Sequence, residues 1–255
     1  DNMNLDIIPC LNDNYSYLIQ DKNTGIAAII DPSDFSSSHN IISKKYKKLD
    51  FILNTHHHLD HVGGNKELKK KYNSKILGFG KDKKRIPEID ILLEENQEFN
   101  VGNLIFKTMF IPGHTSGHIA FYFEKEKVVF TGDSLFSLGC GRIFEGSYRQ
   151  MFDSLNKIKS LPRDTNIYCG HEYTKNNLSF CLKLNPNNTY LKDREKVIEE
   201  KLKDKKPTIP STIEDEIQTN IFLRCDDLDI KDALNLKNAS DLEIFTKLRD
   251  LKDNF

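Results

Sequence analysis

The sequence has no tryptophan, no long apolar run and no excess of charge of either sign. A membrane-spanning helix needs roughly 18 consecutive apolar residues, and no run approaches that length, so we expect no membrane helix. No basic stretch followed by an apolar one begins the chain, so no secretory signal peptide is expected. Lysine and arginine number 37 against 38 acidic residues, a net charge of -1, which argues against a nucleic-acid-binding protein.

Paired cysteines are also missing. The number of cysteines is odd, and no two of them form a CxxC motif. They are Cys10, Cys140, Cys169, Cys181 and Cys225. This spacing is typical of reduced, buried thiols in a reducing compartment. We therefore expect a cytoplasmic protein. An organelle protein whose transit peptide has been removed is the alternative.

The chain still has enough apolar material for a sizeable core. Of its 255 residues, 38% are hydrophobic, and 16 are phenylalanine. Short apolar runs separated by turn signals predict strands at residues 5–9, 15–19, 26–30, 51–53, 75–77, 104–111, 119–123, 127–130 and 166–169. Helices are expected at residues 35–46, 65–72 and 148–160. This mixture predicts an α+β fold in which helices pack outside mixed sheets.

The pattern changes after about residue 173, where helical stretches dominate. Residues 175–183, 189–203 and 240–251 have helical character. A further helix is expected to start at Ser211, which has the spacing of a capping box with Glu214. We therefore predict two domains, residues 1–174 and an all-helical domain at residues 175–255.

The strongest chemical signal is the segment THHHLDH at residues 55–61, directly after an apolar strand. A tight turn after a strand can direct alternate side chains into one cleft. His56 and His58 then suit one metal ion, Asp60 and His61 suit a second, and His57 should point elsewhere. Gly63 and Gly64 follow and give the backbone freedom for a sharp exit.

Three further candidate ligands follow apolar strands. They are His114 in PGHTSGH, Asp133 in TGDS and His171 in GHEY. Sheet proteins gather functional side chains at such strand ends. His118 is expected to orient its turn by hydrogen bonding, and His39 is expected on the surface.

This set of motifs resembles the metallo-β-lactamase superfamily and, within it, glyoxalase II, also called hydroxyacylglutathione hydrolase. The segments that carry the resemblance are THHHLDHVGGN (55–65), TGDSLF (131–136), GCGR (139–142), GHEYT (170–174) and RDLKDNF (249–255). The resemblance covers essentially the whole chain. It implies an αββα metallo-β-lactamase sandwich, here residues 1–174, followed by a helical domain that contributes to glutathione binding.

The resemblance also implies roles for single residues. His56, His58 and His114 would hold one metal ion, Asp60, His61 and His171 a second, and Asp133 would bridge them; Asp60 and Asp133 would be catalytic. Glutathione would be bound by Arg142, Tyr173, Arg249 and Lys252. Two positions depart from the family: Arg142 stands where many members have lysine, and Phe144 stands where many have tyrosine. The missing hydroxyl corresponds to a loss of about 1 kcal/mol if nothing replaces its hydrogen bond.

The implied reaction is hydrolysis of the thioester S-D-lactoylglutathione to D-lactate and glutathione, the second step of methylglyoxal detoxification by the glyoxalase pathway. The implied cofactors are two divalent metal ions, zinc or iron with manganese as a further option, which would activate a shared hydroxide. The partners expected are the glutathione thioester, no nucleic acid and no membrane, and the chain is expected to be a monomer or weak homodimer.

Four other readings fit parts of the pattern. A persulfide dioxygenase of the same superfamily uses one iron and lacks the helical tail. A nuclease on this fold is disfavoured by the balanced charge. A binding protein without activity does not need the complete ligand set. A β-lactamase with two zinc ions usually carries cysteine where Asp133 stands.

Overall fold

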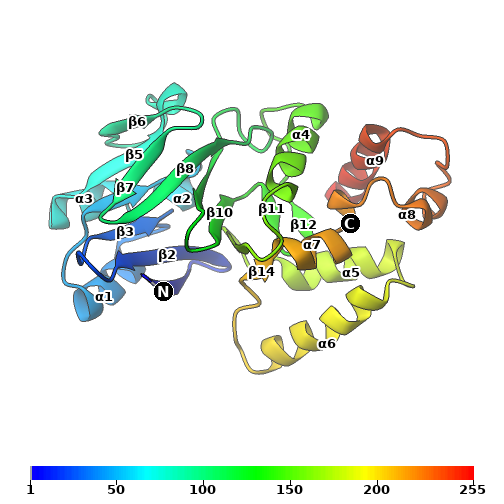
Figure 1. The fold of residues 1–255 in the computed structure, drawn as a ribbon, viewed down its shortest axis with the longest axis horizontal. Coiled ribbons are helices and arrows are strands. Elements are labelled where there is room, and N and C mark those ends of the chain that lie inside the picture. The colour runs from blue at the N-terminus through cyan, green and yellow to red at the C-terminus, as the bar shows by residue number, and fades with distance from the viewer. Residues whose placement is uncertain (1) are drawn as a thin grey trace. The chain divides into compact units, whose positions relative to one another are not determined.

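The structure is a computed structural model that describes residues 2–255. The chain folds into two compact units. Unit 1 comprises residues 1–110 and 117–132, and unit 2 comprises residues 111–116 and 133–255. Figure 1 labels the helices α1 to α9 and most of the strands.

The first sheet of unit 1 is mixed. Its strands, in spatial order, are β1 (Met3–Cys10), β2 (Asn14–Asp21), β3 (Ala27–Ile30), β4 (Phe51–Leu53), β5 (Lys75–Phe79) and β6 (Ile91–Leu93). The pairs β1–β2 and β2–β3 are antiparallel, whereas β3 to β6 are parallel. Parallel neighbours need crossovers, which helices provide after β3 and β4. These parallel strands end at the same edge, which is where the THHHLDH segment begins.

Helices and a second sheet complete unit 1. The helices are α1 (Phe35–Lys45), α2 (Leu59–Val62), α3 (Asn65–Tyr72) and the 3-10 helix η1 (Gly80–Asp82). The antiparallel strands are β7 (Glu98–Val101), β8 (Leu104–Phe110), β9 (Ile119–Phe123) and β10 (Val128–Gly132). Ile42 of α1 and Leu68 of α3 are fully buried against Ile29 and Ile52 of the first sheet.

Aromatic side chains join the two sheets within unit 1. The ring centroid of Tyr17 on β2 lies 5.4 Å from that of Phe130 on β10. Phe51 on β4 meets Phe99 on β7 edge to face, with centroids 5.2 Å apart. Edge-to-face pairs of buried rings add stabilisation beyond the area they bury. Unit 1 is therefore a two-sheet sandwich with one common apolar core.

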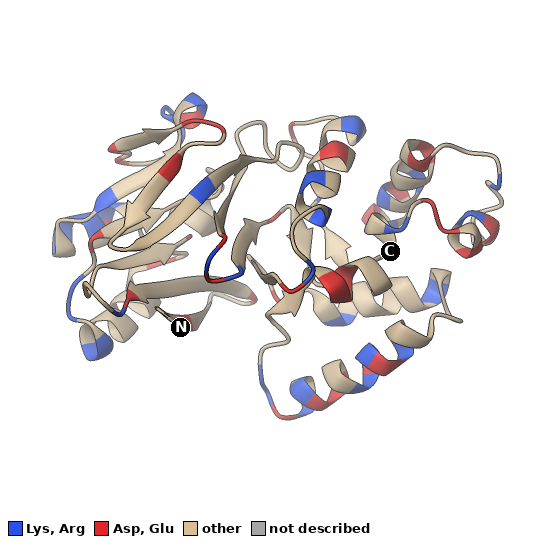
Figure 2. Ribbon diagram, in the orientation of Figure 1, with Lys and Arg blue, Asp and Glu red and all other residues tan. Residues whose placement is uncertain are grey.

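Unit 2 is mostly helical. Its strands are β11 (Leu135–Phe136), β12 (Gly139–Cys140), β13 (Asn166–Cys169) and β14 (Ser211–Thr212). Its helices are α4 (Tyr148–Lys159), α5 (Thr174–Leu184), α6 (Thr189–Lys203), α7 (Ile213–Thr219), η2 (Ile221–Leu223), α8 (Leu228–Ala233) and α9 (Asp241–Asp253). Figure 2 shows both signs of charge interspersed along α6. The fold class is confirmed: two sheets of the sandwich are followed by a helical C-terminal region.

The helical C-terminal region departs from the prediction at its one short strand. β14 pairs with β13, and Ile167 faces Ser211 in the register. Because Ser211 belongs to the strand, α7 is capped one residue later than predicted. The Thr212 side chain accepts a hydrogen bond from the Asp215 backbone N–H, and the Asp215 carboxylate in turn accepts one from the Thr212 backbone N–H. The predicted capping box of Ser211 with Glu214 is therefore wrong by one residue.

The cysteines behave as their spacing predicts. All five are free and buried. Burial raises the pKa of the Cys169 and Cys181 thiols to about 12, which keeps them protonated and unreactive. Within residues 2–255 no helix has the length and apolar character that crossing a membrane requires.

Candidate metal centre

In unit 1 the end of β4 and the short helix α2 place four candidate ligands. His58 is the N-cap residue of α2, so Asp60 and His61 lie in its first turn. One ligand atom of His56 lies within 4.8 Å of one of His58, and the same is true of Asp60 and His61. His56 and His61 are fully buried. The unit therefore presents two adjacent pairs of ligand atoms, as the spacing predicts.

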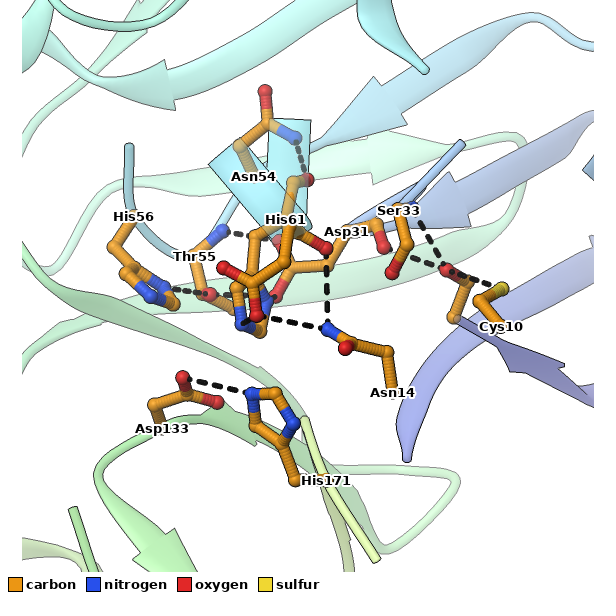
Figure 3. Close-up of polar contacts among 12 residues, drawn as sticks. Cys10, Asn14, Asp31, Ser33, Asn54, Thr55, His56, His61, Asp133 and His171 are labelled. Atoms are coloured by element: carbon orange, nitrogen blue, oxygen red, sulfur yellow. Dashed lines mark hydrogen bonds and ion pairs between the residues drawn. The ribbon is translucent and has the colours of Figure 1, made fainter. Parts of the chain in front are cut away.

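A buried carboxylate, Asp31, holds this segment in place (Figure 3). Its Oδ1 accepts the backbone N–H of Thr55 at 2.8 Å, and its Oδ2 accepts the Thr55 hydroxyl at 2.6 Å. The same Oδ2 lies 3.0 Å from Nδ1 of His61. A carboxylate only accepts, so His61 donates from Nδ1 and keeps Nε2 as its ligand atom.

The imidazole of His56 is fixed by the same network. Its Nδ1 lies 2.9 Å from the Thr55 hydroxyl oxygen. Since that hydroxyl gives its proton to Asp31, it accepts from Nδ1 of His56, and Nε2 is again directed to a ligand. Asp31 was not among the predicted site residues.

Asn14 orients the carboxylate of Asp60. The Asn14 side-chain amide donates to Asp60 Oδ2 at 2.9 Å and to the Asp60 backbone carbonyl at 3.2 Å. Asp60 Oδ2 lies 3.3 Å from Nε2 of His61. The amide therefore fixes both the position and the plane of this carboxylate beside its histidine partner.

The two glycines after the motif serve a different purpose from the one predicted. Gly63 has φ -59° and Gly64 has φ -89°, values open to any residue. A Cβ on Gly63 would lie 2.2 Å from the Ser33 carbonyl oxygen, and one on Gly64 would lie 2.9 Å from that of Asp34. These positions need glycine because the backbone of another loop approaches closely, and not because the chain needs unusual freedom.

The remaining histidines of unit 1 take other roles. His57 points to Asp82, with Nδ1 3.9 Å from Oδ2, and stays outside the ligand pairs as predicted. His118 is buried and stacks on His56 at 4.6 Å between ring centroids. His39 is half-buried, with Nδ1 2.5 Å from the Tyr72 hydroxyl, so its predicted surface position is only partly right.

In unit 2 a single carboxylate oxygen faces two histidines. Oδ2 of Asp133 lies 3.5 Å from Nε2 of His114 and 3.2 Å from Nε2 of His171. All three residues are about 5% exposed. Nδ1 of His114 lies 2.7 Å from the Arg142 carbonyl oxygen, which can only accept. His114 therefore also directs Nε2 towards its acidic partner.

The chemistry of these donors fits a transition-metal ion. Buried imidazole nitrogens beside carboxylate oxygens are typical ligands of zinc, iron and manganese. In three of the histidines the second ring nitrogen is already hydrogen-bonded by the protein, to Thr55, Asp31 and the Arg142 carbonyl group. Such partners fix ring orientation and tautomer in metal sites. The buried His/Asp cluster is consistent with a metal site.

The predicted glutathione-binding residues all lie in unit 2 but differ in exposure. Arg142 is exposed, with Nε 4.0 Å from Asp253. Tyr173 is 38% exposed and stacks on His171, with ring centroids 4.6 Å apart. Lys252 is half-buried and donates to the Asn176 side chain at 2.9 Å.

Arg249 differs from the other three because it is only 3% exposed. Its guanidinium donates to the carbonyl groups of Cys140 at 2.5 Å and Gly141 at 3.3 Å, and it pairs with Asp253 at 2.9 Å. Its donors are thus directed to the GCG turn.

Sequence comparison defines the class and then the family. The model of the metallo-beta-lactamase superfamily matches residues 11–171, and the model of the hydroxyacylglutathione hydrolase C-terminus matches residues 172–255. The chain is therefore a metallo-β-lactamase-fold protein with this additional C-terminal region. It belongs to the hydroxyacylglutathione hydrolase (glyoxalase II) family, whose members are thiolester hydrolases.

Curated relatives support this assignment over nearly the whole chain. The hydroxyacylglutathione hydrolase of Pelagibacter ubique is 54% identical over 253 residues, covering 99% of this chain and all of the relative. That of Brucella ovis is 46% identical over 246 residues, with 96% of each chain covered. Both matches extend across the metal-ligand motifs and the helical region.

Solved structures agree on the fold. A metallo-beta-lactamase from Staphylococcus aureus has a TM-score of 0.67 at 25% identity, covering 99% of this chain and 72% of its own. ETHE1 from Myxococcus xanthus has a TM-score of 0.69 at 22% identity, covering 97% and 90%. At this level of identity the likeness concerns the fold.

Proposed function

We propose that this chain hydrolyses S-D-lactoylglutathione to D-lactate and glutathione at a site built for two divalent metal ions. The observation that carries the proposal is the set of buried His/Asp ligand pairs in a chain of the hydroxyacylglutathione hydrolase family. Zinc, iron and manganese all suit these donors, and availability decides which is bound.

The proposed ligand sets are those that the resemblance to the family implies. His56 and His58 would join His114 at the first ion, and Asp60 and His61 would join His171 at the second. Asp133 would bridge the two ions, because its Oδ2 faces both His114 and His171.

When bound by these residues, the divalent ions would lower the pKa of a coordinated water and would polarise the thioester carbonyl group. Nearby polar residues orient the side chains that would bind the ions. Asp31 and Thr55 fix the tautomers of two histidines, and Asn14 fixes the plane of Asp60. The departing glutathione thiolate has a solution pKa of roughly 8.5, so the reaction needs no dedicated general acid.

Positive charge gathers where the two carboxylates of glutathione would bind. Burial, followed by the nearby Arg249 and Arg142 guanidinium groups, lowers the pKa of Lys252. The Asp253 carboxylate lies 4.0 Å from Arg142 and 2.9 Å from Arg249, and a substrate carboxylate would give these cations a further acceptor. We therefore propose that Arg142 and Lys252 contact the glutathione carboxylates, that Tyr173 lies beside them, and that Arg249 supports the turn bearing Arg142.

Lys252→Ala should raise the KM for S-D-lactoylglutathione about tenfold, the value of one charge-assisted hydrogen bond, and leave kcat nearly unchanged. Lys247→Ala is the matched control, because Lys247 is an exposed lysine on the same helix, α9. Steady-state kinetics of both variants at equal metal content give the comparison. Equal KM values for the two variants would remove Lys252 from the substrate site.

Phe144→Tyr should lower KM about fivefold, because the added hydroxyl can restore a hydrogen bond worth roughly 1 kcal/mol. The side chain is 63% exposed, and its ring meets that of His114 edge to face at 5.3 Å, so a hydroxyl can be added without a clash in the core. Phe255→Tyr, at another exposed phenylalanine, is the control. A KM that stays at the wild-type value would show that the hydroxyl has no partner on the substrate.

The proposed function is tested by following loss of the thioester absorbance of S-D-lactoylglutathione while metal content is measured on the same sample. Rapid turnover with about two metal ions per chain is expected. Fully metallated protein that leaves the thioester intact would refute the substrate. Light scattering would test the further proposal that the chain is a monomer or weak homodimer.

A further inference from the structure

The β11–β12 hairpin lies in the sequence directly between Asp133 and Arg142. Leu135 pairs with Cys140 and Phe136 with Gly139, so the loop consists of Ser137 and Leu138 alone. Leu138 has φ +63°, the left-handed region that a leucine rarely adopts. A two-stranded hairpin of this size is not stable by itself, so the surroundings must hold it in this shape.

Side chains from the helical region provide that support. Glu216 on α7 is fully buried, and its Oε1 accepts the backbone N–H of Leu138 at 2.8 Å. Its Oε2 pairs at 2.7 Å with Arg194 on α6, which also donates to the Ser137 hydroxyl at 2.6 Å. Asn220 donates to the carbonyl oxygen of Gly139 at 3.1 Å. We call Glu216, Arg194 and Asn220 the hairpin clamp.

The stem of the hairpin transmits this support to two candidate metal ligands. The Gly141 N–H donates to the Ser134 carbonyl at 2.9 Å, and a Cβ on Gly141 would lie 1.9 Å from the Asp133 carbonyl oxygen. The next carbonyl, that of Arg142, accepts a hydrogen bond from Nδ1 of His114. A shift of the hairpin therefore moves the backbone of Asp133 and the partner that orients His114.

We infer that the hairpin clamp is a positioning device for the metal centre: the buried Glu216 carboxylate, through the β11–β12 hairpin, sets the geometry of Asp133 and His114. The inference rests on the proposed metal site. None of the three clamp residues belongs to the proposed ligand set, so their effect on the metal is indirect, and the hairpin is the contact that carries it. The helical region then contributes to metal binding as well as to the recognition of glutathione.

The test compares two glutamates on α7. Glu216→Gln keeps the shape and one acceptor but loses the charge that pairs with Arg194. Glu214→Gln is the matched control, because Glu214 also pairs with an arginine, Arg163, at 2.7 Å, yet the pair is exposed. Metal is removed from each folded protein, zinc is titrated back against a chromophoric chelator, and circular dichroism monitors the fold.

We expect Glu216→Gln to weaken zinc binding about tenfold or more, the effect of losing a group that orients metal ligands. Glu214→Gln should bind zinc as the wild type does. A folded Glu216→Gln protein with wild-type zinc affinity would overturn the inference. Cobalt loading adds a spectroscopic readout, since the visible spectrum should change only in the Glu216 variant.

A second variant covers the case in which Glu216→Gln does not fold. Ser137→Ala removes only the hydroxyl that accepts a hydrogen bond from Arg194, and its zinc affinity should still be lower than that of Glu214→Gln. Equal zinc affinities of these two variants would overturn the inference. Wild-type protein is measured in parallel. If the wild-type protein binds fewer than two zinc ions, the proposed dinuclear site is refuted. If every variant binds two zinc ions with equal affinity, only the role of the hairpin clamp is refuted.

Discussion

Asp133→Ala should abolish thioester hydrolysis and reduce metal binding at both positions. Oδ2 of Asp133 faces Nε2 of two histidines, so one substitution removes a ligand from each proposed ion. It also leaves His114 and His171 without the negative charge beside them. We expect kcat/KM to fall by more than about 10³-fold, as when a group central to transition-state stabilisation is removed. Metal analysis of the purified variant should find well under two ions per chain.

Asp153→Ala is the control for this substitution. Asp153 lies on α4 of the same unit, is exposed and pairs only loosely with Arg149 at 3.9 Å. An exposed pair of this kind contributes little to stability. The control should retain wild-type metal content and rate. Full turnover by Asp133→Ala with one ion still bound would remove the bridging role.

Much of the fold follows from the pattern of apolar residues. The predicted elements at residues 65–72, 119–123, 166–169 and 189–203 coincide with α3, β9, β13 and α6. These elements carry their own signals, such as alternation, length and capping residues. The boundaries of these elements depend on residues that are near in the sequence, and so they can be predicted from the sequence.

Several of the missed strands are short and are defined by their pairing. β6 has three residues and β11 and β12 have two each, which leaves little or no alternation to detect in the sequence. They are strands because a neighbouring strand pairs with them. β14 shows the same effect, since its pairing with β13 takes Ser211 out of the predicted cap. Tertiary pairing here overrides the local capping signal.

In the candidate site, too, features with a local sequence pattern were predicted, and contacts between distant residues were not. The spacing of His56, His58, Asp60 and His61 predicted that their side chains would gather, and the structure places them in two adjacent pairs. Asp31 was not, since a single aspartate carries no local signal and its partners Thr55 and His61 lie more than twenty residues away. The buried contacts of Arg249 were hidden for the same reason, because they join α9 to a turn over 100 residues earlier. The assignment of roles to the ligands and glutathione-binding residues, and the domain boundary at residue 174, remain predictions.

Asp31→Ala should weaken metal binding about 10- to 100-fold, although Asp31 is not in the proposed ligand set. Its carboxylate accepts the backbone N–H and hydroxyl of Thr55 and the Nδ1–H of His61. Without it, His61 can adopt the other tautomer and Thr55 no longer fixes His56. The loss should be largest at the ion proposed to bind Asp60 and His61. Zinc titration of the metal-free protein measures both affinities.

Asp50→Ala separates this role from general support of the sheet. Asp50 also accepts a hydrogen bond from a backbone N–H, that of Ala27 at 2.9 Å. This bond lies where β3 and β4 begin, whereas Asp31 follows the end of β3. Both variants should lose thermal stability, because each leaves a backbone N–H without its acceptor. Only Asp31→Ala should bind metal more weakly, and it should therefore turn over more slowly when zinc is limiting. Excess zinc should partly restore its rate of thioester hydrolysis. If the two variants lose affinity equally, the effect of Asp31 is a general loss of stability and not the orientation of His61.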